Sequence, residues 1–488
     1  MFLKNKKPIT KKDIIISSIL LFIFVYFYLF PFLAIKFNQI RAVNIIKSNV
    51  YYGVNSGLTI NDADKAYPGN TIFTSFAGHL DKDGRVNNSI LINNNGDIVK
   101  EWDILGFPAK LLPGGNILGN DRLCNYTPEN IHQEACAIVE LDWDGEEVWK
   151  FDKWEADSKG NLIARSHHDF QRSNSSVIFT PNLPLASTSS EKTLILSHTT
   201  VLNKDINSEP LEDDALLEVG ADGIILWKWV ASDHFLEYGF TEPMKKAILN
   251  SKLFKNKLLG GFHYPNATID WLHLNSAKYL GPNIWYDNGD KRFAPDNIII
   301  SSRNGCFVAI VDKQTGKIVW QLGPDYSDGP EKEIGQIIGQ HDAYIVPKGL
   351  PGEGNIILFD NGGFSCYGNF LGISTFPANF RKYSRVLEID PVSLKIVWEY
   401  SQPESKGEQK EFFSWLMGSA QRLSNGNTLI TETATGRIFE VTKDKEIVWE
   451  YYALFPNGAE ANSLGSENYI YTAYRYPDEW FPRINHQK

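Results

Sequence analysis

Four polar clusters, three of which contain histidine, stand at matching points of a repeated sequence pattern. His167 and His168 lie in SHHDF, His273 lies in DWLHLNS and His341 lies in GQHDA, each just before a run of residues typical of a β-strand. An imidazole titrates near neutral pH, so several imidazoles together can supply a nucleophile, a general acid and hydrogen-bond donors to an anion. A histidine followed by aspartate is also a common structural hydrogen bond, so the chemical and the structural interpretations both stay open.

The fourth cluster, GSAQRL, has Gln421 and Arg422 in the place of a histidine, and Arg303 follows a strand-like run in SSRNG. A guanidinium makes forked hydrogen bonds to an oxyanion, so Arg303, Gln421 and Arg422 are candidate ligands of a sulfate or phosphate ester, together with His167. Arg422 is equally well interpreted as a buried tie between repeats. The chain has no Gly-rich phosphate loop and no credible G-x-S-x-G turn, and we predict no metal and no cofactor.

The elements that position these residues are strands of a sixfold repeat. A turn, two or three aliphatic residues and a tryptophan recur as GEEVWKF, GIILWKW, GKIVWQL, LKIVWEY and KEIVWEY, with a weaker first copy, GDIVKEW, that has Lys100 in the tryptophan position. Two further strand-like runs precede each copy, and a fourth strand is expected. Units of this kind bury both faces of their sheets by radial stacking, so we predict an all-β, six-bladed β-propeller in which the tryptophans pack blade against blade. Equivalent positions of successive blades then converge on one central funnel, where we place the catalytic candidates His168, His273 and His341.

Composition agrees with this fold class and excludes one class of partner. The 488 residues include 13 Trp, 21 Tyr, 29 Phe, 38 Gly and 23 Pro, which is typical of many short strands joined by tight turns. The net charge of −10 offers no electrostatic footprint for nucleic acid, so no nucleic-acid partner is expected.

The segment Ile14–Ile35 contains no charged residue and is long enough, as a helix, to cross a bilayer. Five lysines precede it, so the positive-inside rule predicts a signal anchor with its N-terminus in the cytoplasm and the propeller in the periplasm or outside the cell. The expected organisation is a cytoplasmic stub and transmembrane helix over 1–36, a linker or packing segment over 37–66, and the propeller over 67–488 with insertions in its third and fourth repeats. One insertion contains EPMKKAILNSKLFKNKLL, whose composition is helical.

The four cysteines are compatible with an oxidising compartment. Cys124 and Cys136 flank one insertion, and either form a loop disulfide or remain two free thiols. Cys306 lies in an apolar strand run and Cys366 in a Gly-rich turn, with a spacing unlike that of a metal site.

The second half of the chain resembles the bacterial arylsulfotransferases. DWLHLNSAKY, NIIISSRNG, TGKIVWQLG, GQHDA, ILFDNGG, SAQRLSNGNTLI, GRIFEVT and EIVWEY stand in the order of that family. The resemblance implies a periplasmic six-bladed propeller in which a phenolic sulfate ester gives its sulfuryl group to a histidine and a second phenol takes it, without a nucleotide sulfate donor. It also implies that His273 and His341 bind and polarise the sulfuryl group, and that Arg303 is the family's arginine.

Two departures from the family pattern bear on activity. The family has an arginine shortly after FDNG, where this chain has Gly363 and Phe364, and its sulfated histidine lies in the last blade, where FFSWLMGSAQRL has none. Either His168 or His167 takes the nucleophilic role from another blade, or the transfer has been lost. The expected function is therefore an arylsulfotransferase-like or sulfatase-like enzyme, and the alternative is a non-catalytic, membrane-anchored propeller that serves as a binding or assembly scaffold.

Overall fold

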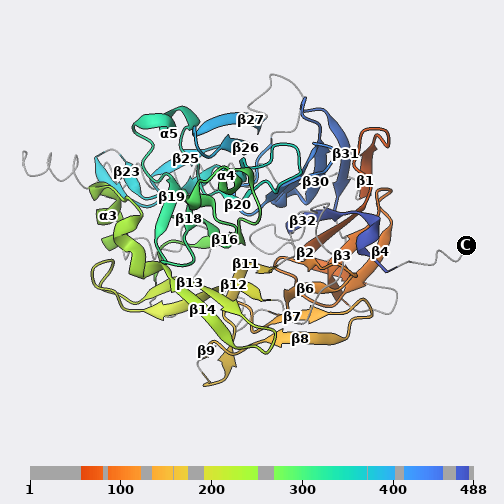
Figure 1. The fold of residues 1–488 in the computed structure, drawn as a ribbon, viewed down its shortest axis with the longest axis horizontal. Helices are drawn as coiled ribbons and strands as arrows, with labels where there is room; N and C mark the ends of the chain where they lie inside the picture. Colours follow the sequence, from red (N-terminus) through yellow and green to blue (C-terminus); the bar gives the residue numbers. More distant parts are fainter. Residues whose placement is uncertain are drawn as a thin grey trace, which may run out of the picture.

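The computed structural model describes residues 57–80, 86–122, 134–157, 159–173, 192–250, 269–370, 372–401, 412–453 and 469–482. Within these residues six sheets of four or five strands lie around a common centre (Figure 1). The protein is an all-β, six-bladed β-propeller, as the tryptophan repeats predict.

The first three blades, each given from its innermost to its outermost strand, contain the following elements. The first blade consists of β32 (Ile470–Tyr476), β2 (Asn70–Leu80), β3 (Val86–Ile92) and β4 (Ile98–Trp102). The second consists of β5 (Lys110–Leu111), β6 (Ile117–Asn120), β7 (Ile138–Leu141) and β8 (Glu147–Phe151). The third consists of β11 (Ser166–Arg172), β12 (Thr193–Val201), β13 (Leu211–Val219) and β14 (Ile225–Val230), and β15 (Ile269–Asp270) pairs with β13 in parallel.

The last three blades repeat the same antiparallel order. The fourth consists of β16 (Leu274–Tyr279), β17 (Ile298–Ser302), β18 (Phe307–Val311) and β19 (Ile318–Leu322). The fifth consists of β20 (His341–Ile345), β21 (Ile356–Asp360), β26 (Arg385–Asp390) and β27 (Lys395–Ser401). The sixth consists of β28 (Ser419–Arg422), β29 (Thr428–Glu432), β30 (Arg437–Val441) and β31 (Ile447–Tyr452).

Two strands close the ring by joining distant parts of the chain. β32, near the C-terminus, is the innermost strand of the first blade and pairs with β2. β1 (Gly57–Asn61), near the start of the described residues, adds a fifth strand to the outer edge of the sixth blade by pairing with β31. Because both closures are backbone hydrogen-bond ladders, the first and last blades are held as firmly as any sequential pair.

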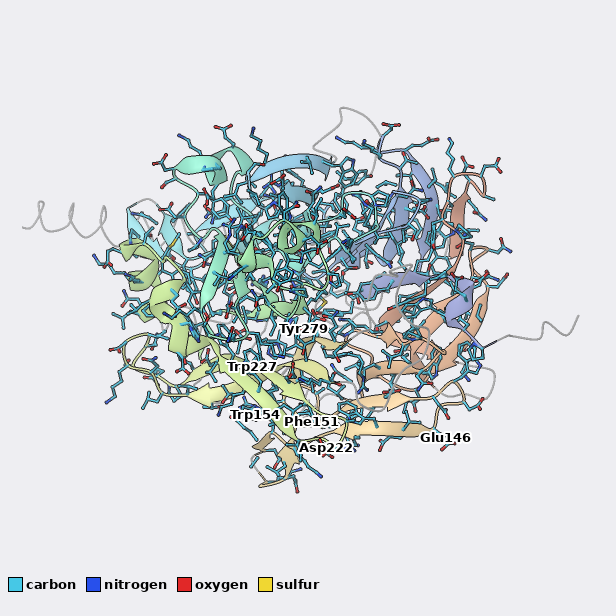
Figure 2. The ribbon with its side chains drawn as sticks, in the orientation of Figure 1. Glu146, Phe151, Trp154, Asp222, Trp227 and Tyr279 are labelled. Atoms are coloured by element: carbon cyan, nitrogen blue, oxygen red, sulfur yellow. A yellow bond between two sulfur atoms is a disulfide. The ribbon has the colours of Figure 1, made fainter. Side chains whose placement is uncertain are left out.

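Among the described residues the six largest apolar clusters each draw their residues mainly from two neighbouring blades. Phe151 and Trp154, labelled in Figure 2, lie in the cluster between the second and third blades, whereas Trp227 of β14 packs against the cluster between the third and fourth blades. The sheets therefore bury their faces against one another, which is why no blade needs a core of its own.

The repeated tryptophans connect successive blades by hydrogen bonds as well as by packing. An indole N–H from the outer strand of each of the last five blades donates to a turn carbonyl of the following blade at 2.7–3.1 Å: Trp149 to Ala221, Trp229 to Gly316, Trp320 to Pro391, Trp398 to Lys443 and Trp449 to Asn94. In the first blade Lys100 lies 5.7 Å from the ring centre of Trp143 in the second. The predicted blade-to-blade role of the motif is confirmed, although the third blade donates from Trp229 rather than from the aligned Trp227.

The remaining elements lie in connections between strands. They are β9 (Glu155–Ala156), β10 (Leu162–Ile163), β22 (Gly363–Ser365), β23 (Gly368–Phe370), β24 (Ile373–Thr375), β25 (Asn379–Arg381), α3 (Glu242–Leu249), α4 (Ile284–Asp287), α5 (Gly329–Ile334) and the 3-10 helices η2 (Ala231–Glu237), η4 (Lys291–Phe293), η5 (Thr433–Thr435) and η7 (Asp478–Trp480). The strands β22 to β25 form two nested antiparallel pairs inserted in the fifth blade, β22 with β25 and β23 with β24, and α3 packs against β23 and β24.

Several predicted features lie wholly or partly outside the described residues. Among the helices of the described ranges, none is long and apolar enough to cross a membrane, and the predicted span Ile14–Ile35 is outside those ranges. Cys136 takes part in a disulfide, whereas Cys124 is outside the described residues. The predicted helical insertion is described only as far as residue 250, where α3 confirms a helix.

Candidate functional site

Three innermost strands carry the histidines, and each strand is irregular at that point. The ladder of β11 slips between Ser166 and Phe170, that of β16 between Leu274 and Ser276, and that of β20 between His341 and Tyr344. Such bulges turn side chains away from the regular alternation of a strand.

The backbone is also strained there. His168 (φ 55°) and His273 (φ 52°) adopt the left-handed conformation, as does Asp342 (φ 55°) next to His341. Left-handed residues other than glycine are uncommon and cluster at functional sites. Three successive blades therefore have a left-handed residue at or next to the funnel histidine.

Four of the predicted site residues, His168, His273, His341 and Arg303, converge. The rings of His168 and His273 meet edge to face with centres 4.7 Å apart. The pKa of His168 lies well below its usual value, first because the ring is buried, and then because His273, His341 and Arg303 are close enough for their charges to oppose its protonation. These side chains come from the third, fourth and fifth blades and form one site.

His341 is a buried, neutral imidazole with a defined tautomer. Burial is the main cause that lowers its pKa to about 3, and the nearby charge of Arg303 lowers it further. Its Nδ1 lies 2.9 Å from the carbonyl oxygen of Gly339 and 2.8 Å from Oδ1 of Asn361. Because both partners accept hydrogen bonds, Nδ1 carries the proton and Nε2 has the free lone pair.

His273 is oriented by a carboxylate. Its Nδ1 is hydrogen-bonded to Oδ2 of Asp270, the last residue of β15. The side chain of His273 is 14 % exposed, more than those of His168 and His341. A carboxylate on Nδ1 leaves Nε2 as a lone-pair nitrogen and stabilises the positive charge that develops when that nitrogen attacks an electrophile.

His168 is paired with the preceding histidine. The Nδ1 atoms of His167 and His168 lie 2.9 Å apart, so one donates and the other accepts. Both rings are buried, and burial is the main cause that holds each pKa well below its usual value. His167 lies behind His168 and does not line the central cavity described below.

Arg303 is held to the site by its backbone. Its N–H donates to the carbonyl of His273 at 3.0 Å, and its own carbonyl accepts from Oγ of Ser365 at 2.6 Å. A disulfide between Cys306 and Cys366 joins the same two segments, the β17–β18 turn and the hairpin insertion of the fifth blade. The cysteine spacing did not indicate this pairing, which fastens the arginine loop across two blades.

A small central cavity of about 10 Å³, room for about one water molecule, opens at His168 and His341, whereas His273 and Arg303 do not line it. It is lined by His168, Asp169, Asn275, His341, Asp342, Gly418, Tyr471, Thr472 and Tyr474. Phenol, amide, carboxylate and imidazole groups thus face one space on the propeller axis, which suits a small polar group rather than a large apolar ligand.

A buried chain of alternating charges holds the inner strands together below the histidines. Lys110 Nζ lies 2.5 Å from Oδ1 of Asp169, and Lys278 Nζ lies 2.5 Å from Oδ1 of Asp342 and 3.6 Å from Oδ2 of Asp169. Tyr474 donates to Asp342 at 3.2 Å. Because each charge is paired, these residues fix the relative positions of five blades around the site.

A search for related proteins places this site in a known family. The profile of the family described as "Arylsulfotransferase (ASST)" matches residues 136–453, which is more than half of the chain and includes His168, His273, Arg303 and His341. The chain belongs to the arylsulfotransferase family. A search of curated proteins finds no match.

Solved structures similar to this arylsulfotransferase-family chain are distant. A protein of unknown function from Bacteroides caccae is 11 % identical with a TM-score of 0.40, covering 84 % of this chain and 99 % of its own. A virginiamycin B lyase from Staphylococcus aureus is 12 % identical with a TM-score of 0.32, covering 77 % and 84 %. A protein described as the Dos1 propeller is 10 % identical with a TM-score of 0.31, covering 81 % and 75 %.

Gln421 and Arg422 lie apart from the funnel histidines of this family member. Gln421 exchanges two hydrogen bonds with the backbone of Arg475, at 2.9 and 2.7 Å, and so joins the sixth blade to the first. Arg422 pairs with Glu388 at 2.7 Å and donates to the carbonyl of Pro351 at 3.1 Å, which joins the sixth blade to the fifth. In the sixth blade Gly418, rather than either of these residues, lines the cavity.

Proposed function

We propose that this chain transfers a sulfuryl group from a phenolic sulfate ester to a phenolic acceptor, with a histidine of the funnel as the intermediate carrier. The observation that carries the proposal is the convergence of His168, His273, His341 and Arg303 from three blades on one site. A scaffold has no use for strained histidines gathered on its axis, whereas residues that only tie blades together would point into separate blade interfaces.

The geometry favours His273 as the nucleophile. It combines a carboxylate on Nδ1 with the greatest exposure of the three histidines. In the first step Nε2 forms a bond to sulfur while the bond from sulfur to the aryl oxygen breaks, and the phenolate leaves with the electron pair. In the second step the acceptor oxygen bonds to sulfur, and the bond from sulfur to nitrogen breaks. Asp270 stabilises the charged imidazole between the two steps.

His341 suits the role of general acid and base. Protonated when the donor ester is bound, its Nε2 can give a proton to the leaving phenolate in the first step, and the neutral Nε2 can then take the proton of the acceptor phenol in the second. The bound sulfuryl group is negative, so substrate binding raises the pKa of His341 from its low value in the free protein towards the useful range. Arg303 and His168 are the candidate donors to the sulfuryl oxygens.

The location of the chain is part of the same proposal. A propeller on the non-cytoplasmic side of a membrane, anchored by the segment Ile14–Ile35, would meet aryl sulfates outside the cytoplasm. The disulfide between Cys306 and Cys366 supports an oxidising compartment.

The test is a donor assay on the full-length chain with 4-nitrophenyl sulfate. We expect release of nitrophenol that accelerates with added phenol, and formation of phenyl sulfate. His273→Ala should reduce both to background, and His341→Ala should reduce them about 100- to 10,000-fold. His234→Gln is the matched control, because His234 contacts Glu237 at 2.9 Å on η2, away from the funnel.

Three outcomes would decide against the proposal. Nitrophenol release that phenol does not accelerate would indicate hydrolysis rather than transfer. Equal rates in His273→Ala and the parent chain would remove His273 from the chemistry. No release by any form of the chain would leave a non-catalytic role.

A further inference from the structure

Tyr367 connects an insertion of the fifth blade to the segment that carries His273. It lies between β22 and β23, and its hydroxyl donates to the carbonyl oxygen of Trp271 at 2.7 Å. Trp271 and Leu272 are the two residues between His273 and Asp270, whose carboxylate is hydrogen-bonded to the imidazole. The phenol therefore holds the peptide that joins the carboxylate residue to the imidazole residue.

The carbonyl oxygens of this segment are all engaged. Each of the four, from residue 270 to residue 273, accepts a hydrogen bond at 2.7–3.0 Å. The donors are Nδ2 of Asn304 to Asp270, the hydroxyl of Tyr367 to Trp271, Oγ of Ser302 and the N–H of Asn304 to Leu272, and the N–H of Arg303 to His273. Residues 302–304 belong to the fourth blade, whereas Tyr367 comes from the fifth, so the segment is clamped between two blades.

This clamp matters because the backbone of His273 is strained. Its φ of 52° is a left-handed conformation, which a residue with a side chain keeps only where its surroundings over-determine it. Trp271 is fully buried, so removal of the Tyr367 hydroxyl leaves a buried carbonyl oxygen without its partner. The segment can then relax, and Asp270 and His273 move with it.

The ring of Tyr367 is held independently of its hydroxyl. The residue is buried in the apolar cluster between the third and fourth blades, with its ring centre 4.8 Å from that of Phe376 and 6.3 Å from that of Phe240. Burial raises the pKa of Tyr367 well above its usual value, and the charge of Asp270 raises it further, so the hydroxyl remains a donor near neutral pH. Tyr367→Phe therefore removes one hydrogen bond and leaves the packing in place.

Three consecutive residues of the insertion tie it to the funnel. Ser365 donates to the carbonyl of Arg303, Cys366 forms the disulfide with the β17–β18 turn, and Tyr367 donates to Trp271. The first two hold the arginine loop and the third holds the histidine segment. One short stretch of the fifth blade thus fixes two functional groups relative to each other.

We propose that Tyr367 is a positioning residue for the sulfuryl carrier. Acting through Trp271, it holds Asp270 and His273 so that Nδ1 of the imidazole faces the carboxylate and Nε2 faces the substrate. Its hydroxyl is engaged with the backbone and does not itself contact the substrate. The inference rests on the proposed function of His273, and it gives the insertion of the fifth blade a role in the transfer.

The test compares Tyr367→Phe with Tyr238→Phe in the full-length chain. Tyr238 is fully buried in the same cluster, and its hydroxyl donates to the carbonyl oxygen of Ala231 at 2.9 Å rather than to the His273 segment. With 4-nitrophenyl sulfate and phenol we expect Tyr367→Phe to lower kcat about 10- to 100-fold and to leave KM within about twofold. Tyr238→Phe should keep kcat, although both variants lower the melting temperature by a similar amount.

A spectroscopic readout does not need substrate. In the chain with ¹⁵N-labelled histidine, the proton between Nδ1 of His273 and the carboxylate of Asp270 gives a downfield NMR signal, which is assigned by its loss in Asp270→Asn. We expect this signal to persist in Tyr238→Phe and to be shifted or lost in Tyr367→Phe, because the geometry of that hydrogen bond changes.

The outcomes separate this inference from the proposed function. Equal kcat values in Tyr367→Phe and Tyr238→Phe, with an unchanged signal, overturn the positioning role. A higher KM at an unchanged kcat places Tyr367 in substrate binding and also overturns it. If no form of the chain transfers a sulfuryl group, the proposed function fails, whereas a change of the signal in Tyr367→Phe and not in Tyr238→Phe still supports the link between Tyr367 and the pair of Asp270 and His273.

Discussion

Acidification should destabilise this propeller through His341, and the size of the effect follows from its burial. The pKa of His341 is lowered to about 3 in the folded chain, whereas an unfolded histidine titrates near 6.5. The stabilising contribution is therefore fully present above pH 6.5 and is lost as the pH falls towards 3. Between pH 7 and pH 5 the unfolded chain takes up nearly one proton at this residue and the folded chain almost none, which costs about 2 kcal/mol of unfolding free energy.

The comparison between the parent chain and His341→Asn isolates this effect. An asparagine amide can replace Nδ1 as donor to Gly339 and Asn361, but it does not titrate. Urea unfolding followed by tryptophan fluorescence at pH 7 and pH 5 gives the loss of stability for each protein. We expect the parent chain to lose about 2 kcal/mol more than the variant. Equal losses would show that His341 is protonated in the folded chain at pH 5 and would refute its assignment as a buried neutral base.

Three further predictions concern the site and the closure of the ring. Asp270→Asn should lower kcat about 10- to 150-fold with little change in KM, because it removes one charge-assisted hydrogen bond, and an unchanged kcat would contradict the carboxylate's role. Arg475→Met leaves the fully buried carboxylate of Glu440 without its guanidinium partner. It should lower the free energy of unfolding in urea by about 3–5 kcal/mol. Adding Glu440→Leu should recover most of that loss, and a further loss would refute the pairing. Replacing both Cys306 and Cys366 by serine opens a loop of 60 residues and should lower the unfolding free energy by about 2–5 kcal/mol, whereas unchanged stability would show that the bond constrains nothing.

The repeats predicted the fold because the same local signals occur in every blade. An outer-strand tryptophan or its substitute bridges each pair of blades, so the motif marks a contact and not only a strand. The ring closures were not predicted. β32 pairs with β2, and β1 with β31, across almost the whole chain, and a sequence pattern carries no signal for which ends meet.

The site was predictable only where a histidine recurred at the matching point of the repeat. SHHDF and GQHDA placed His168 and His341, and DWLHLNS, at the matching point of its repeat, placed His273, whereas nothing in the pattern marked Lys110 or the tyrosines of β32 as neighbours of the cavity. Gln421 lies at the predicted position of the repeat, but its side chain does not line the cavity. Side chains alternate along a strand, and β28 has a continuous ladder with β29, without the bulge that turns the histidines inward.

The buried cluster around His198 was not predicted from the sequence. The three neighbours of His198 in this cluster, His167, Asp214 and Glu134, come from separate strands and a loop that are far apart in the sequence. Only the fold brings their atoms together. His167 was predicted from its motif as a ligand of a sulfate or phosphate ester, and in the structure it stacks on His198 behind His168.

The most direct test of the sulfuryl carrier is peptide mass mapping after exposure of the full-length chain to 4-nitrophenyl sulfate without an acceptor. The proposal predicts one added sulfuryl group (SO₃) on the peptide that contains His273, its loss on addition of phenol, and its absence in His273→Ala. A sulfuryl group on His168 instead, or transfer to phenol with no modified peptide at any time, would contradict it.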